Sequence, residues 1–176
     1  MLAEFTAANE MGRLSREVVG IGPVIAAGLM SHIDIRKAPT VGHIYSFAGI
    51  APGIEWKKGQ KRPWNARLKT LCWKIGESFV KNQNRNGDFY GQIYVQAKEH
   101  LQRQNDADEF SDAAAAKLEK FNIGKTTDAY AAYSKGKLPP AHIHSRAKRV
   151  AVKLFLSHWH QRAYRVMLGR DAPTPY

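Results

Sequence analysis

The segment Gly20-Ile21-Gly22-Pro23 has the residue types that bind phosphate through the protein backbone. Glycine leaves the backbone bare, so an anion can approach its amides closely. Pro23 fits the first position of a new helix, where unpaired N–H groups carry the positive end of the helix dipole. The segment therefore predicts a hairpin between two helices that contacts phosphate with Gly20, Ile21 and Gly22. The alternative is a tight turn between two core helices, since a lone Gly-x-Gly is a weak signal.

Lysine and arginine supply the second candidate chemistry. The 176 residues hold 27 Lys and Arg against 15 Asp and Glu, a net charge of +12, so polyanions are the leading class of partner. Residues 57–85 carry nine cations against one acid, and residues 137–170 carry eight cations and no acid, while residues 86–121 are net acidic. The predicted nucleic-acid contacts outside the hairpin come from the two basic blocks: Lys57, Lys58, Lys61, Arg62, Arg67, Lys69, Arg146, Arg149 and Lys153.

Three tryptophans lie among the cations of the first basic block. An indole beside cations can stack on a base or sugar while the cations meet phosphate. Trp56 and Trp64 fall in a turn-rich loop, which favours this function, and the alternative is that they pack in the core. Trp73 falls on an apolar helical face, so we interpret it as a core residue.

Nucleophiles and metal ligands give weaker signals. Ser46 is the serine nearest the basic loop, but no residue pattern activates it, and helix packing is the favoured interpretation. Cys72, the single cysteine, lies at an apolar helical position and excludes a disulfide framework. His142 and His144, like His158 and His160, are two residues apart on a predicted helix and do not share a face. No metal site is predicted.

These residues must be positioned by helices. Apolar residues recur at three- and four-residue spacing and strand-like alternation is scarce, so an all-α fold is predicted. Gly, Pro, Asn and Asp give the boundaries, and residues after 168, with Pro173 and Pro175, predict a loose tail. The predicted helices cover residues 2–18, 23–32, 40–48, 66–81, 88–105, 109–121, 126–134 and 140–168.

The longest uncharged stretch, residues 18–33, is shorter than the roughly 20 apolar residues that span a bilayer, and a Gly-Pro turn breaks it. The amino terminus lacks a basic region followed by an apolar run. No membrane partner is expected, and the expected location is the cytoplasm.

The order of motifs resembles a known family. Residues 18–29 look like a helix-hairpin-helix, and after them come Ser46-Phe47-Ala48-Gly49-Ile50-Ala51-Pro52, a basic glycine loop, and Asn65-Ala66-Arg67-Leu68. This order is similar to the carboxy-terminal domain of the Piv-type insertion-sequence transposases, which join a RuvC-like domain to a helical domain. Residues 140–156 resemble the family's closing helix.

The resemblance implies a function in DNA transposition and recombination, and it implies three regions: a helix-hairpin-helix domain with basic loop at 1–81, a helical insertion at 82–138, and a basic C-terminal helix and tail at 139–176. It also implies a guide RNA as a partner and a homo-oligomer in the active complex. The alternative is a helix-hairpin-helix module that binds DNA or RNA backbone without any role in mobility.

Two departures from the family pattern leave enzymatic activity open. The loop after Pro52 contains no hydroxyl or thiol side chain where the family's nucleophilic serine is expected, which leaves Ser46 as the only candidate nearby. The acidic residues of a RuvC-like domain also have no counterpart here. A divalent metal would then belong to a RuvC-like domain supplied in trans or missing from a fragment, and no cofactor is expected in this chain.

Overall fold

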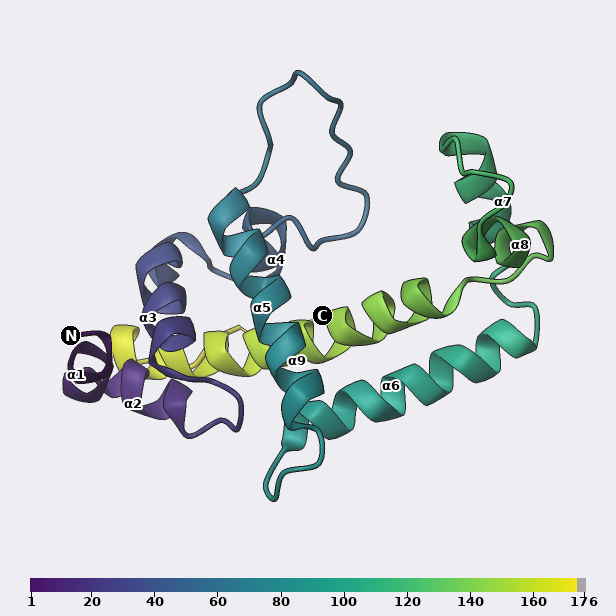
Figure 1. Cartoon of the computed structure of the whole chain (residues 1–176). Coiled ribbons are helices and arrows are strands. Elements are labelled where there is room, and N and C mark those ends of the chain that lie inside the picture. The colour runs from purple at the N-terminus through teal and green to yellow at the C-terminus, as the bar shows by residue number, and fades with distance from the viewer. Residues whose placement is uncertain (174–176) are drawn as a thin grey trace.

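The chain folds into helices alone. The computed structural model describes residues 1–173, and within them it contains nine α-helices, one short 3-10 helix and no strand, which confirms the all-α prediction (Figure 1). The tail prediction at Pro175 lies outside these residues. The elements are α1 (Leu2–Ala8), α2 (Glu10–Arg16), α3 (Pro23–His32), η1 (Ile35–Lys37), α4 (Val41–Phe47), α5 (Ala66–Asn82), α6 (Phe89–Asp106), α7 (Ser111–Lys120), α8 (Asp128–Ser134) and α9 (Pro140–Leu168).

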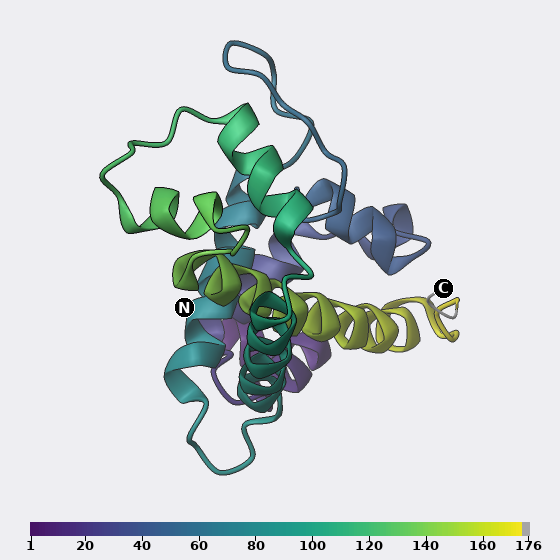
Figure 2. The same ribbon diagram turned by 90° about the vertical axis from the view of Figure 1, so that its right-hand side faces the viewer.

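Helix α9 is the element on which the others pack. It runs along most of the molecule, with α6 beside it, α5 crossing it, and α2, α3 and α4 around its C-terminal half (Figures 1 and 2). Its buried face includes Phe155, Leu156 and Trp159, and Phe79 of α5 and Tyr90 of α6 pack against Phe155. The helix ends at Gly169, whose φ of +64° suits a residue without a side chain.

A second, smaller core lies at the other end of α9. Ala114 of α7, Leu138 and Ile143 are buried there together, and Phe110 and Tyr133 pack against them. Helices α7 and α8 thus form a lobe (residues 109–136) apart from the main core, whereas α6 belongs to the main core through Tyr90 and Tyr94.

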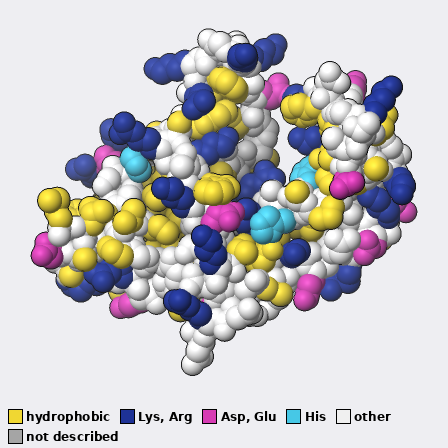
Figure 3. All heavy atoms as spheres, in the orientation of Figure 1, with side chains coloured by type: hydrophobic (Ala, Val, Ile, Leu, Met, Phe, Trp, Pro, Cys, Tyr) yellow, Lys and Arg dark blue, Asp and Glu magenta, His cyan; other side chains and the backbone are white. Residues whose placement is uncertain are grey.

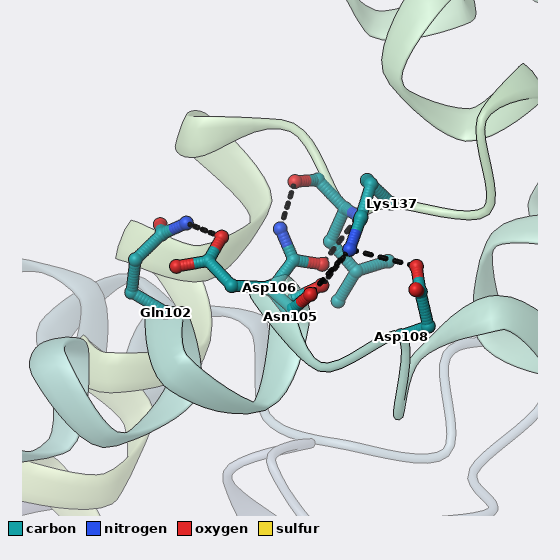
Figure 4. A network of polar contacts seen from close by, with 6 residues as sticks. Gln102, Asn105, Asp106, Asp108 and Lys137 are labelled. Atoms are coloured by element: carbon teal, nitrogen blue, oxygen red, sulfur yellow. Dashed lines mark hydrogen bonds and ion pairs between the residues drawn. The ribbon is translucent and has the colours of Figure 1, made fainter.

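A polar network fastens the base of this lobe. The side chain of Lys137 reaches the carbonyl oxygens of Asn105 and Asp106 at 2.7 and 2.8 Å and the carboxylate of Asp108 at 2.7 Å (Figure 4). Gln102 donates to the carboxylate of Asp106 at 2.9 Å in the same view. The two ends of the lobe are therefore held together where the chain leaves α6 and returns to α9.

Most of the helices begin directly after a residue whose side chain caps the helix by accepting a hydrogen bond from a first-turn amide. The Asn65 side chain accepts a hydrogen bond from the N–H of Leu68 at 3.0 Å, and that of Asp88 accepts one from Gly91 at 3.1 Å. Both satisfy amides that a helix start leaves unpaired. The start of α3 at Pro23 and that of α9 at Pro140 agree with the sequence prediction.

The single helix predicted over residues 2–18 is wrong. The chain turns at Asn9, whose extended backbone ends α1 and whose side chain caps α2. The turn brings Gly12 against Thr6 so closely that a Cβ on Gly12 would lie 2.3 Å from the Thr6 carbonyl oxygen. Packing between the two short helices, which helical periodicity does not reveal, causes the break.

No helix within residues 1–173 combines the length and the apolar character that crossing a bilayer requires.

Candidate nucleic-acid interface

Two facing stripes of side chains, one on α5 and one on α9, line a cleft between these helices. Residues at positions i, i+3, i+4 and i+7 share one face of a helix. The cleft has a volume of about 250 Å³, and Gly49 and Ile50 also line it. We call it the α5–α9 cleft, and its helical lining consists of Lys69, Cys72, Trp73 and Gly76 of α5 with Ser145, Lys148, Arg149 and Val152 of α9.

Cations from three segments lie near Lys69 and Arg149, two residues that line this cleft. Burial lowers the pKa of Lys69, and the nearby positive charges of Arg149 and Arg62 lower it further. Burial and the charge of Arg149 likewise lower the pKa of Lys153 and that of Arg146. These five side chains come from the basic loop, α5 and α9, and each is close enough to another to repel it. We call them the cation cluster.

Acids do not neutralise the cation cluster. Seven ion pairs form within the described part of the chain, and none involves Arg62, Lys69, Arg146, Arg149 or Lys153. Glu77, which follows the cleft residue Gly76 on α5, is paired with Lys148, whose ammonium holds the pKa of that carboxyl below its usual range. The cleft therefore carries excess positive charge, which favours an anionic ligand.

The predicted basic loop, residues 53–64, extends from the body of the protein before α5 (Figure 1). Lys57, Lys58 and Lys61 are exposed on it. Figure 3 shows Lys and Arg side chains over this loop and in the middle of the same face, and a notch between the loop and the α7–α8 lobe. Lys120 of α7 pairs with Glu55 of the loop at 3.0 Å, so an ion pair joins the two sides of this notch.

The three tryptophans of this region have different environments. Trp64 is half-buried against Gly49, and the ammonium of Lys69 lies 3.9 Å from its ring centroid. Trp56, on the loop, packs edge-on against Trp64 and donates a hydrogen bond to the Gln60 carbonyl at 2.7 Å. Trp73 is 61% exposed in the α5–α9 cleft, so its interpretation as a core residue is wrong.

The glycine hairpin lies apart from the cation cluster. Gly20 has a φ of +90°, and its carbonyl accepts a hydrogen bond from the Ser78 hydroxyl at 2.5 Å. Ser78 lies 12 residues after Ala66, the first residue of α5. Twelve helical residues span about 18 Å, so the hairpin packs near one end of α5 and the basic loop precedes the other.

The hairpin amides are only partly accessible. Ile21 is buried, and its N–H is bonded to the Val18 carbonyl at 2.9 Å. Gly22 is open, since a Cβ there would meet no atom within 4 Å. Of the predicted hairpin contacts, Gly22 is the one that a phosphate can reach without a change in packing.

Arg67 is exposed but is two residues from Lys69 on α5, and residues two apart do not share a helix face. The structure thus brings together Arg62, Lys69, Arg146, Arg149 and Lys153 of the predicted contacts, with Lys57, Lys58 and Lys61 on the adjoining loop. Lys148, on the same helix as Arg146, Arg149 and Lys153, was not among the predicted contacts, and Trp73 was interpreted as a core residue. A sequence signal for Lys148 and Trp73 does exist, because each belongs to a stripe of residues spaced i, i+3, i+4, i+7 on its helix. The two stripes indicate a shared cleft only when α5 and α9 are known to pack together.

The four histidines of α9 form hydrogen bonds with residues of other segments of the chain. His142 pairs with the Tyr133 hydroxyl at 3.2 Å, His144 with that of Tyr94 at 2.8 Å, and His158 with that of Tyr90 at 2.9 Å. His160 contacts the Ala38 carbonyl at 2.8 Å. Throughout residues 1–173, no three His, Cys, Asp or Glu side chains gather closely enough to hold a metal ion.

The two candidate nucleophiles have no activating base. Ser46 is exposed on α4, and its hydroxyl makes no hydrogen bond with the residues that the structure describes. Cys72 is 3% exposed at the floor of the α5–α9 cleft, and burial raises the pKa of its thiol to about 12. A thiol with that pKa is not a nucleophile at neutral pH.

Comparison of the chain with protein families, with curated proteins and with solved structures finds no match.

Proposed function

We propose that this chain is a DNA-binding domain that grips the phosphate backbone with the cation cluster around the α5–α9 cleft. One observation carries the proposal: five cations from three segments lie close enough for their charges to interact, Lys69 and Arg149 among them line the cleft, and none of the five has an acidic partner among residues 1–173. Because these like charges repel one another, they raise the energy of the free protein. A polyanion removes that repulsion and releases its own counterions on binding.

The two kinds of cation give the contact different properties. The guanidinium groups of Arg62, Arg146 and Arg149 can each donate two parallel hydrogen bonds to one phosphate, whereas Lys69 and Lys153 act as point charges. Arg146 is also held in place, because its guanidinium carbon lies 4.6 Å from the ring centroid of Phe110. A rigid donor loses less entropy when it binds.

The resemblance to Piv-type transposases supports a place for this binding in DNA transposition and recombination. On this proposal the catalytic acids and their divalent metal come from a RuvC-like domain, a guide RNA is a second polyanionic ligand, and the active complex is a homo-oligomer in the cytoplasm. The chain itself contributes DNA binding and not bond cleavage, in agreement with the missing loop serine.

A salt titration tests the DNA contact. Affinity for a duplex of random sequence, measured by fluorescence anisotropy between about 50 and 200 mM salt, should fall linearly on a double-logarithmic plot. Replacing Lys69 and Arg149 with Gln should make the slope shallower by about 0.9 for each lost phosphate contact. A flat salt response of the unmodified protein would reject the proposal.

A matched control separates the cleft from net charge. Lys98 and Arg103 are exposed on α6 and do not line the α5–α9 cleft. Replacing both with Gln removes the same charge, so a uniformly attractive surface predicts equal losses for the two double variants. The cleft proposal predicts a much smaller loss for the α6 variant.

The position of the hairpin favours a second candidate. A hairpin that lies about 18 Å along α5 from the basic loop can bind backbone on a different part of the ligand, as a non-mobile module that recognises branched DNA or RNA would. Recombination in a reconstituted system distinguishes the two functions. Adding a RuvC-like subunit should restore strand exchange for a transposase domain, and a non-mobile module would bind DNA without it.

A further inference from the structure

We infer that the α5–α9 cleft accepts one unpaired base stacked on the Trp73 indole, so that its preferred ligand is single-stranded nucleic acid. The inference rests on the proposed function and narrows its ligand. Trp73 is 61% exposed, although its neighbours Cys72 and Leu71 on the same helix are buried. Leaving an indole in water forfeits a large burial energy, which a stacked ring would recover.

The lining of the cleft combines two chemistries that a nucleotide also combines. Ile50, Cys72 and Val152 give it an apolar floor, and Trp73 adds an aromatic surface. Lys69, Lys148 and Arg149 line it as well and supply positive charge. An inorganic anion gains nothing from the apolar floor, and an apolar ligand gains nothing from the cations. A base joined to a phosphate uses both, which is how proteins bind single strands without reading sequence.

The Lys148 side chain is fixed beside the indole. Its ammonium lies 5.8 Å from the Trp73 ring centroid and is paired with Glu77. That ion pair limits the freedom of Lys148, so the ammonium stays near the edge of the space where a base would stack. Arg149 has no such partner among the described residues and is free to meet the phosphate that flanks the base.

A base in a duplex cannot enter this cleft unless its base pair is broken and the base leaves the stack. The bases of a duplex hide their faces in the stack, and the cleft, at about 250 Å³, has room for a single nucleotide but not for a double helix. A paired base would have to leave the stack, at a cost that an unpaired base does not incur. The cleft therefore discriminates strand state through Trp73, while the cation cluster alone would bind either form.

Three probes and the full chain test this inference. The probes are a fluorescein-labelled oligothymidine of about 12 nucleotides, a hairpin duplex with the same number of phosphates, and an abasic deoxyribose-phosphate oligomer of the same length. We expect the oligothymidine to bind most tightly. Trp73→Ala should weaken its binding by roughly 5- to 150-fold, the range measured for loss of one base stack. Trp73→Phe should recover part of the loss.

Two controls test whether any loss of binding comes from base stacking on Trp73. The abasic oligomer should bind weakly and equally to the protein and to Trp73→Ala, since it has no base to stack. Phe89→Ala removes another exposed aromatic, on α6 and outside the cleft, and should leave oligothymidine binding unchanged. Circular dichroism checks that each variant is folded.

Equal binding of duplex and oligothymidine, or an oligothymidine affinity that Trp73→Ala leaves unchanged, overturns the inference and leaves the proposed function standing. Binding of none of the probes overturns both. A fourth probe, polyglutamate, tests for an acidic protein partner: binding as tight as that of oligothymidine overturns the inference in favour of such a partner.

Discussion

Asn105 and Leu138 exchange two hydrogen bonds between the end of α6 and the start of the segment that leads into α9. The Asn105 amide donates to the Leu138 carbonyl at 3.0 Å, and its side-chain oxygen accepts from the Leu138 N–H at 2.8 Å. Both residues are buried. One amide side chain thus replaces a missing backbone partner and closes the loop of chain that carries α7 and α8.

We expect Asn105→Ala to destabilise the protein by about 2 to 6 kcal/mol, because it leaves a buried N–H and a buried carbonyl unpaired at about 1 to 3 kcal/mol each. Urea denaturation measures the loss, and faster exchange of the Leu138 amide proton should locate it. Gln102→Ala is the control on the same helix: its bond to Asp106 is exposed, and its removal should change stability by less than about 0.5 kcal/mol. Equal effects of the two substitutions would contradict the assigned function of Asn105.

Gly12 gives a second stability test. In Gly12→Ala the new methyl group would lie 2.3 Å from a backbone oxygen of Thr6, and backbone cannot move aside as a flexible side chain can. Forced overpacking costs about 1 to 3 kcal/mol, and here it should detach α1 from α2. Thermal denaturation with near-terminal amide exchange measures both effects.

Gly22→Ala is the matched control for Gly12. Gly22 has a φ of −86° and open space around the position of a Cβ. Loss of a favourable N-cap and gain from a stiffer unfolded chain act in opposite directions, so the net change should stay within about 0.5 kcal/mol of zero. A Gly12→Ala variant as stable as Gly22→Ala would contradict the close packing of α1 on α2.

The contrast between these glycines explains how far the sequence predicts the fold. The starts of α3, α4, α5, α6 and α9 follow from local signals, such as Pro23, Thr40, Asn65 and Asp88, whose effect does not depend on distant contacts. The break at Asn9 has a local signal as well, since the Asn9 side chain caps α2, but the contact of Gly12 with Thr6 that accompanies it is not evident from periodicity. Periodicity continues through it and predicts one helix.

The candidate site has the same limit. Arg146, Arg149 and Lys153 recur at helical spacing and could be placed on one face of α9 from the sequence. Their meeting with Lys69 depends on the crossing of α5 and α9, which is a tertiary fact. Trp73 occupies an apolar helical position, and only the cleft beside it explains why it is exposed.

His142 makes stability depend on pH. Burial, with the charges of Arg146, Lys117 and Arg149, lowers its pKa from 6.5 to about 4, and it pairs with the Tyr133 hydroxyl of α8. The unfolded chain therefore binds a proton at a higher pH than the folded one. The stabilisation is complete above about pH 6.5 and is lost progressively as the pH falls towards 4.

The urea midpoint measured between about pH 7.5 and 4 should fall with pH, and His142→Gln should make that fall shallower. A residual slope should persist, because burial also lowers the pKa of His144, His158 and His160. His100→Gln, at an exposed position on α6, should leave the profile unchanged. A midpoint that rises as the pH falls from 6.5 to 4 would show that the folded state binds the extra proton.

The ion pair of Lys120 with Glu55 restrains the basic loop without stabilising the fold. Both side chains are largely exposed, at 64% and 76%, so Lys120→Ala should change the free energy of unfolding by less than about 1 kcal/mol. The pair nevertheless ties a loop with few other contacts to α7. Trypsin should cleave first after Lys57, Lys58 or Lys61, and Lys120→Ala should accelerate that cleavage, because a loop must open to enter a protease.

The dependence of the cleavage rate on salt distinguishes an effect of the Lys120–Glu55 ion pair from a general effect of charge. Rising ionic strength screens an exposed pair, so loop cleavage in the unmodified protein should approach the rate of Lys120→Ala, whose own rate should change little. Lys125→Ala removes an exposed cation from the α7–α8 connection and should leave the cleavage rate as it was. Equal cleavage of all three proteins at low salt would mean that the loop is held by Trp56 and Trp64 alone, and the notch between loop and lobe would then be free to open without breaking an ion pair.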